Sequence, residues 1–184
     1  MSKFLIIFII LNFYNPVFPS TKEKIIYQMQ LINNLSFNFI QTIENKNESG
    51  KCIIQYPKKI WCKYESSNKK TIVANGKSLV IKTSNRGSYY RYPLNRTPLV
   101  FLLDKEYLIS KMSALKPREV NDKYLNFEII ENNNKINVFF DKSNLNLIGW
   151  QTEDVYQNLV ITFVSSVKIN QKIDNKIFIL PKNN

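Results

Sequence analysis

Cys52 and Cys62 are the two residues of this sequence whose type and spacing most directly indicate chemistry. They stand in GKCIIQYPKKIWCKY, a pattern of strand, turn at residues 57–59, and strand, with the cysteines at mirrored distances from the turn. In an oxidising compartment an even pair indicates one disulfide, and cysteines opposed across a hairpin can form it. The alternative is two small buried hydrophobic side chains. We predict the disulfide, and no metal site, because the other soft ligands are missing.

Histidine is absent from the chain. This removes the commonest general base, the Ser-His and Cys-His nucleophile arrangements, and the commonest metal ligand. Serine and aspartate remain, so a hydrolase without a histidine base is a remote alternative. We therefore predict no catalytic residue, no cofactor, and a binding protein in place of an enzyme.

The formal net charge is +12. Such an excess indicates a nucleic acid, an anionic membrane surface or an acidic partner, or else lysines scattered over solvated faces. Because Lys58-Lys59 and Lys69-Lys70 are pairs at expected turns and no basic run reaches five residues, we favour scattered lysines and predict no nucleic-acid partner.

The first residues of the chain have the pattern of an export signal. One lysine precedes an apolar run at residues 4–13, and Pro16 and Pro19 follow it. The run is too short to span a bilayer, and cleavage near Ser20 fits a signal peptide, although Phe18 is bulky for its place. A buried first helix is the alternative. We predict a signal peptide at 1–20 and one domain at 21–184, without lipid modification because no cysteine follows the run.

Residues 21–35 have the pattern of an amphipathic helix, with Thr21 as N-cap and Ile25, Met29 and Ile32 on one face. Short apolar or alternating runs follow, separated by turn signals at 48–50, 75–76, 85–87, 132–134 and 143–144, and Asn75-Gly76 suits a type I′ turn. The runs are residues 36–43, 51–56, 60–64, 70–74, 78–82, 88–92, 124–130, 136–140, 145–151, 159–165 and 176–180. This pattern predicts a meander of antiparallel hairpins, open or closed into a barrel.

One segment, LNRTPLVFLLDKEYLI, breaks the strand pattern. Thr97 can cap a helix, Pro98 fits its first turn, and the five residues that follow are all apolar. A short helix without a polar face must be covered on every side. It could cover the mouth of a curved sheet, or it could be an ordinary core helix.

Alternation along the strands predicts an apolar inner face. In the first hairpin Cys52, Ile54 and Tyr56 share a face with Ile60, Cys62 and Tyr64. Such a face around one helix forms either a packed core or a lipid-sized cavity, and periodicity does not separate the two.

The order of these features resembles the family of outer-membrane lipoprotein carriers, the periplasmic LolA proteins. The matching pieces are FIQTIENKNESGKCIIQYPKKIWCKY, TIVANGKSLVI, TPLVFLL and FFDKSNLNLIGWQTEDVYQNLVITFVSSVKINQKIDNKIFIL, which together cover nearly the whole mature chain. The resemblance implies an incomplete antiparallel β-barrel, a curved half-barrel with an N-terminal helix and a helical lid. It also implies a periplasmic carrier of acylated lipoproteins, loaded by an inner-membrane ABC transporter and unloaded at an outer-membrane lipoprotein receptor.

The resemblance places the site in this sequence. The lid would be Thr97, Pro98, Leu99, Val100, Phe101, Leu102 and Leu103. The cavity wall would include Ile54, Tyr56, Ile60, Leu79, Ile81, Phe127, Ile129, Val138, Phe140, Ile161 and Phe163, with faces assigned from alternation. In well-known members an arginine directly before the hairpin proline helps to latch the lid, and here that position is Tyr56, which lacks the charge for such a bond.

Two alternatives share the half-barrel. An outer-membrane receptor of the same fold would need a lipid-modified cysteine after the signal, and none is present. A periplasmic lipid-sensing or protein-binding scaffold would be expected to have a further domain. This chain has no room for one, so we predict a carrier, and we expect it to be a monomer.

Overall fold

The computed structural model describes residues 18–65, 69–83, 87–131, 134–154 and 157–183. Residues 1–17 of the predicted signal peptide therefore lie outside the described residues. Parts of the predicted turns at 85–87 and 132–134 also lie outside them. None of the helices in the described part of the chain is long and apolar enough to cross a membrane.

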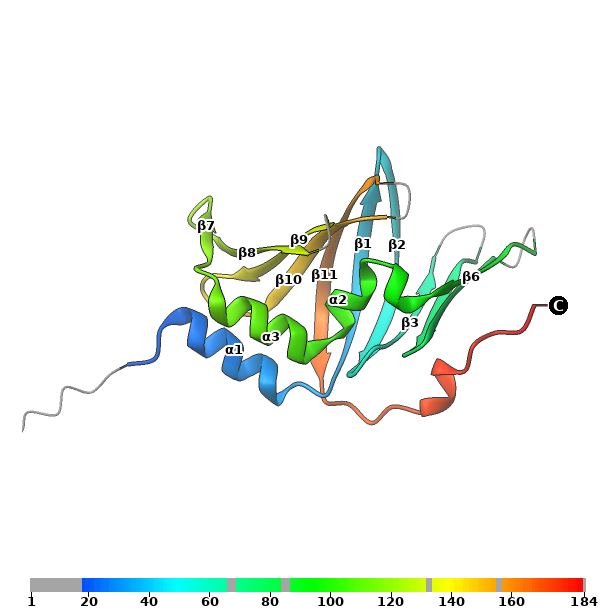
Figure 1. The fold of residues 1–184 in the computed structure, drawn as a ribbon, viewed down its shortest axis with the longest axis horizontal. Helices are drawn as coiled ribbons and strands as arrows, with labels where there is room; N and C mark the ends of the chain where they lie inside the picture. Colours follow the sequence, from blue (N-terminus) through cyan, green and yellow to red (C-terminus); the bar gives the residue numbers. More distant parts are fainter. Residues whose placement is uncertain (1–17, 66–68, 84–86, 132–133, 155–156, 184) are drawn as a thin grey trace, which may run out of the picture.

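One antiparallel sheet dominates the molecule (Figure 1). Its strands are β1 (Asn34–Ile43), β2 (Lys46–Gln55), β3 (Lys59–Tyr64), β4 (Thr71–Asn75), β5 (Ser78–Lys82), β6 (Tyr89–Pro93), β7 (Arg118–Val120), β8 (Tyr124–Glu131), β9 (Asn134–Asp141), β10 (Leu147–Glu153) and β11 (Leu159–Ile169). The order is β6-β5-β4-β3-β2-β1-β11-β10-β9-β8-β7, so β6 and β7 are edges and the sheet is not closed. The predicted mainly β fold with an incomplete antiparallel barrel is confirmed.

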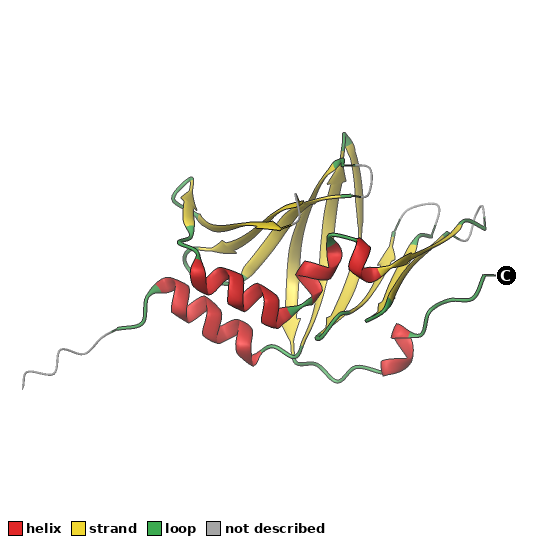
Figure 2. Ribbon diagram, viewed as in Figure 1, coloured by secondary structure: helices red, strands yellow, loops and turns green. Residues whose placement is uncertain are grey.

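Three α-helices lie on one face of this sheet, which we call the inner face (Figure 2). They are α1 (Thr21–Leu31), α2 (Leu99–Leu103) and α3 (Lys105–Ala114), with 3-10 turns η1 (Leu94–Arg96) and η2 (Asn175–Phe178). The N-cap of α1 is Ser20 and not the predicted Thr21, because the Ser20 hydroxyl accepts from Glu23 N while Ser20 N donates to the Glu23 carboxylate.

The hairpin of β2 and β3 carries the predicted disulfide. Cys52 and Cys62 are directly opposed in the strand register, with their Cα atoms 4.1 Å apart, and their sulfur atoms are bonded. The Tyr56–Pro57 peptide bond in the connecting turn is cis.

Three local predictions are wrong. Residues 48–50 lie inside β2 and not in a turn: a Cβ on Gly50 would meet the Lys63 carbonyl and the Phe39 ring, so this glycine allows a close approach of strands. The turn at Asn75-Gly76 exists, but only Gly76 has a positive φ, 97°, whereas type I′ needs two such residues. Residues 176–180 form η2 and an extended tail because Phe178 packs beside β3 and β4 on the face away from the helices.

Candidate functional site: an apolar cavity under a short helix

An apolar cavity of about 90 Å³ lies between the helices and the inner face of the sheet. Its polar lining side chains are Gln28, Asn146 and the tips of Tyr56 and Trp150, and the remaining lining residues are aliphatic or Phe. The lining is Ile25, Gln28, Met29, Ile32, Leu35, Ile54, Tyr56, Leu99, Leu102, Leu108, Val138, Phe140, Leu145, Asn146, Leu147, Trp150, Val167 and Ile169. The site therefore joins α1, α2 and α3 to the strands at the centre of the sheet.

Most predicted wall residues lie on the inner face, but only some of them line the cavity. Ile54, Tyr56, Val138 and Phe140 do so. Five others lie around it: Ile60, Leu79, Phe127 and Ile129 are buried in the packed core, and Ile81 is half-buried. The sequence thus identified residues of the inner face, but it did not show which of them line the cavity and which pack in the core.

The assignment of Ile161 and Phe163 to the wall is wrong. In β11 the buried side chains are Val160 and Thr162, whereas Phe163 is 58% exposed on the opposite, outer face. Both alternating sets of this strand are largely apolar, so the period of two could not tell which set faces inward.

Four of the twelve lining residues that the wall and lid predictions left out belong to α1 or its C-cap. Ile25, Met29 and Ile32 form the apolar helix face that the sequence predicts, and this face is one side of the cavity. Its i, i+4, i+7 spacing was the signal that could have added them to the wall.

The predicted lid corresponds to α2. Leu99 and Leu102 line the cavity, Leu103 is fully buried, and Phe101 packs against Tyr107 of α3 with ring centroids 5.1 Å apart. Thr97 is not its N-cap, because the Thr97 hydroxyl donates to the Leu94 carbonyl and Pro98 occupies the cap position. The helix α3, which the sequence analysis did not separate, continues the lid after Asp104.

Lys58, two residues after Tyr56, ties the hairpin to the end of α2. Its backbone N–H donates to the Leu103 carbonyl at 2.8 Å, and its ammonium lies 2.9 Å from the Asp104 carboxylate. The other Asp104 oxygen accepts from Tyr107 N and so caps α3. One aspartate therefore joins the hairpin, the end of α2 and the start of α3.

Tyr56 does not make this connection. Burial raises the pKa of its hydroxyl to about 12, and among the described residues the hydroxyl has no hydrogen-bond partner. Its ring contributes apolar surface to the cavity. The charged contact between the hairpin and the end of α2 is therefore made by Lys58 and not by residue 56.

Two lysines hold α1 against α3. Lys22 at the start of α1 donates to the Ser113 carbonyl at 2.8 Å, and Lys105 at the start of α3 donates to the Gln30 and Ile32 carbonyls, both at 3.0 Å. Each cation thus meets unpaired carbonyls at the C-terminal end of the other helix, where the helix dipole favours positive charge.

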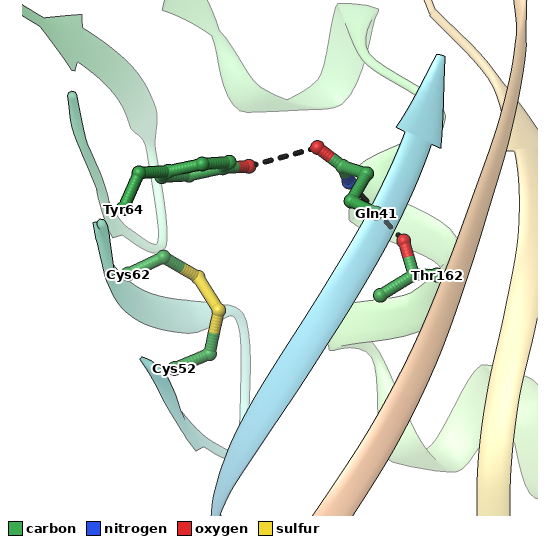
Figure 3. The surroundings of a disulfide bond; sticks show 5 residues. All are labelled: Gln41, Cys52, Cys62, Tyr64 and Thr162. Atoms are coloured by element: carbon green, nitrogen blue, oxygen red, sulfur yellow. Dashed lines mark hydrogen bonds between the residues drawn. A yellow bond between two sulfur atoms is a disulfide. The ribbon is translucent and has the colours of Figure 1, made fainter. Parts of the chain in front are cut away.

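A chain of polar side chains lies on the inner face near the disulfide (Figure 3). The Tyr64 hydroxyl donates to Gln41 at 2.9 Å, and the Gln41 amide donates to the Thr162 hydroxyl at 3.1 Å. Burial raises the pKa of Tyr64, and the Glu48 carboxylate adds to this rise. Lys70 lies over the Tyr64 ring and pairs with Glu48.

The arrangement is suited to holding an apolar ligand. In the described part of the chain no group of three His, Cys, Asp or Glu side chains is placed to hold a metal ion. The cavity of about 90 Å³ is smaller than the roughly 150 Å³ apolar cavity that admits one benzene, so a long apolar chain does not fit into it in this conformation.

A family model described as "Outer membrane lipoprotein carrier protein LolA" matches residues 30–180. No curated protein matches the sequence. Among solved structures, an uncharacterized conserved protein from Thermus thermophilus aligns with a TM-score of 0.52 and 8% identity, over 89% of this chain and 96% of that one.

Two further solved structures bear related descriptions. A LolA superfamily protein from Nitrosomonas europaea aligns with a TM-score of 0.45 and 10% identity, over 87% of this chain and 98% of that one. A putative outer membrane lipoprotein-sorting protein domain from Vibrio parahaemolyticus gives 0.44 and 10%, over 85% and 95%.

Proposed function

The chain belongs to the outer membrane lipoprotein carrier protein LolA family, and from this membership we propose that it is a periplasmic carrier of acylated lipoproteins. The observation that carries the proposal is the apolar cavity closed by α2, with Leu99 and Leu102 facing into it. Family membership supports a binding role in place of catalysis. We propose that the cavity shelters acyl chains and that α2 is the lid.

The finer parts of the proposal follow the family. Residues 1–20 are a cleaved signal peptide, and the mature carrier is a monomer. It receives lipoproteins from an inner-membrane ABC transporter and delivers them to an outer-membrane lipoprotein receptor. No cofactor takes part, because binding and release of an apolar chain need none.

The closed cavity is small, so loading must couple to lid movement. Outward motion of α2 breaks the two Lys58 contacts at Leu103 and Asp104 and exposes Leu99 and Leu102. Acyl chains entering beneath the helix then replace these apolar contacts. At about 0.8 kcal/mol per buried methylene, a short stretch of chain offsets the lost contacts.

The test is displacement of a fluorescent fatty-acyl probe by diacyl and triacyl lipopeptides, compared with the same peptides without lipid. Affinity should rise steeply with acyl-chain length and level off once the opened cavity is full. Equal competition by the bare peptides would contradict the carrier and favour a protein-binding scaffold.

A substitution in the lid links the binding to this cavity. Leu99→Asp places a charge on the cavity wall and should lower probe affinity at least about tenfold. Ile130→Asp, at a position 68% exposed on the sheet, is the matched control and should leave affinity unchanged. Unchanged probe binding by folded Leu99→Asp protein would show that the probe binds elsewhere.

A further inference from the structure

Positive charge is concentrated in one stretch of the chain. Residues 50–103, which run from the middle of β2 to the end of α2, contain eleven of the 26 Lys and Arg residues but only one of the 14 acidic residues, Glu65. The remainder of the chain is nearly balanced, with fifteen basic and thirteen acidic residues. The half of the sheet from β2 to β6 therefore carries most of the net charge.

The strand register brings several of these cations together on the outer face. Lys51 is directly opposite Lys63, Lys63 is opposite Thr71, and Thr71 is opposite Lys82, which places three lysines in one row across four strands. Lys51 and Lys63 are exposed, and among the described residues neither forms an ion pair. Like charges directly opposed across strands destabilise a sheet, so this row has a cost in the isolated protein.

Exposed apolar side chains flank the lysine row on the same face. Ile40 of β1 and Phe163 of β11 are directly opposed and are 55% and 58% exposed. On the other side, the C-terminal segment crosses the outer face beside Trp61, and its Ile179 is 69% exposed between Lys176 and Lys182. The outer face thus carries basic and exposed apolar side chains together.

We propose that this outer face, with Lys51, Lys63 and Lys82 at its centre and Ile40, Phe163 and Ile179 at its margins, docks on an anionic lipid bilayer. Anionic headgroups would neutralise the opposed lysines, and the exposed apolar side chains would enter the headgroup region. The proposal concerns the face opposite the cavity and does not depend on which ligand the cavity holds.

The distribution of the groups favours a lipid surface over an acidic protein. The lysines are spread over β2, β3 and β5, and the apolar side chains extend from β11 to the C-terminal segment. A bilayer offers negative charge over its whole surface with apolar chains beneath it, and so matches a wide face that mixes the two kinds of side chain.

Vesicle flotation tests the proposal with the mature protein. Binding to phosphatidylcholine vesicles containing phosphatidylglycerol should exceed binding to pure phosphatidylcholine and should fall as salt is added. Absence of binding to the anionic vesicles, or equal binding to both, would overturn the proposal and leave an acidic protein as the partner of this face.

Matched variants locate the contact. Lys51→Ala/Lys63→Ala should lower vesicle affinity about 25-fold, since each lysine near an anionic surface contributes about fivefold. Lys116→Ala/Lys123→Ala removes the same charge from exposed positions in the balanced half and should change affinity less than about twofold. An equal loss in both variants would mean that net charge alone drives binding, which contradicts the proposed face.

The soluble acyl-probe assay separates this proposal from the carrier function. Both lysine variants should bind the probe as the parent protein does, because Lys51 and Lys63 lie on the face away from the cavity. Normal vesicle docking without probe binding would contradict the carrier function and would still support the docking face.

Discussion

The two halves of the sheet differ in how their charged side chains are paired. In the half built from β7 to β10, with α3 beside it, three lysines have acidic partners: Lys111 of α3 pairs with Glu131, Lys135 with Glu128 and Lys142 with Glu119. In the other half, the described residues form the pairs Lys58–Asp104 and Lys70–Glu48, and both acids lie outside residues 50–103. The strand register thus gathers Lys51, Lys63 and Lys82 in one row, which the expectation of scattered lysines did not foresee.

The halves also differ in how they are stabilised. The disulfide lies in the half from β2 to β6, here called the basic half, which also has the row of opposed lysines. The half from β7 to β10, here called the ion-paired half, contains Phe127 and Phe140, whose rings meet edge to face with centroids 5.9 Å apart. The cavity lies where the halves meet, beneath helices that contact both. Both halves contribute buried side chains to the core, and the basic half has the disulfide in addition.

The largest expected effect tests packing in the ion-paired half. Phe127 is fully buried, so Phe127→Ala should lower the free energy of unfolding by about 3–5 kcal/mol through lost burial and a residual cavity. Chemical denaturation measures the change. Phe163→Ala, on the outer face, is the control and should stay within about 0.5 kcal/mol. A large loss in the control would mean that Phe163 is part of the core after all.

The next effect tests the crosslink in the basic half. Replacing Cys52 and Cys62 by alanine should lower the free energy of unfolding by about 3 kcal/mol, the value expected for a loop of this length. Thermal and chemical unfolding of both forms give the difference. Thiol titration of unreduced, denatured parent protein should find no free thiol, and two free thiols would refute the crosslink.

Much of the fold could be predicted from local pattern. The hairpins, the disulfide and α2 follow from alternation, mirrored cysteine spacing and an unbroken apolar run in the sequence. Helix α3 was missed because KEYLISKMSA mixes polar and apolar residues, and only Leu108 and Met112 are buried in it. Short amphipathic helices of this kind take their stability from tertiary packing, which a local pattern does not reveal.

The site was less predictable because it depends on contacts between distant segments. Lys58 and Asp104 are joined only once α2 has folded over the hairpin, and no local signal marks that pair. The lysine row likewise needs the exact register of four strands. The sequence could not show which side chains of β11 point inward, because both alternating sets are largely apolar.

A third prediction concerns two tyrosine hydroxyls of the basic half. Tyr64→Phe removes the hydrogen bond to Gln41 and should cost about 1 kcal/mol, whereas Tyr56→Phe should cost less than about 0.5 kcal/mol because its hydroxyl has no partner among the described residues. Equilibrium unfolding at neutral pH measures both. A larger loss for Tyr56→Phe would reveal a bond that the closed structure lacks.

Alkaline pH tests the raised pKa of Tyr56. Since burial raises the pKa of Tyr56 to about 12 in the folded protein, the folded state keeps a proton that the unfolded chain loses near pH 10. This contribution to stability is complete below pH 10 and is lost as pH rises through about 12. Tyr56→Phe should therefore lose less stability than the parent between pH 10 and 12. Identical pH profiles would contradict the raised pKa.

The smallest effect compares the halves directly, by removing one lysine charge from each. Lys135→Gln breaks the 2.7 Å pair with Glu128, and because both side chains are largely exposed it should lower the free energy of unfolding by about 0.2–0.5 kcal/mol. Lys51→Gln removes one of two opposed lysines, so it should raise the free energy of unfolding by a few tenths of a kcal/mol. Unfolding measured at low salt gives the two signs, and about 1 M salt should bring both changes toward zero because the charges are screened. Losses of equal sign and size would mean that the lysine row carries no repulsion, and the contrast between the halves would then rest on the disulfide and the aromatic core alone.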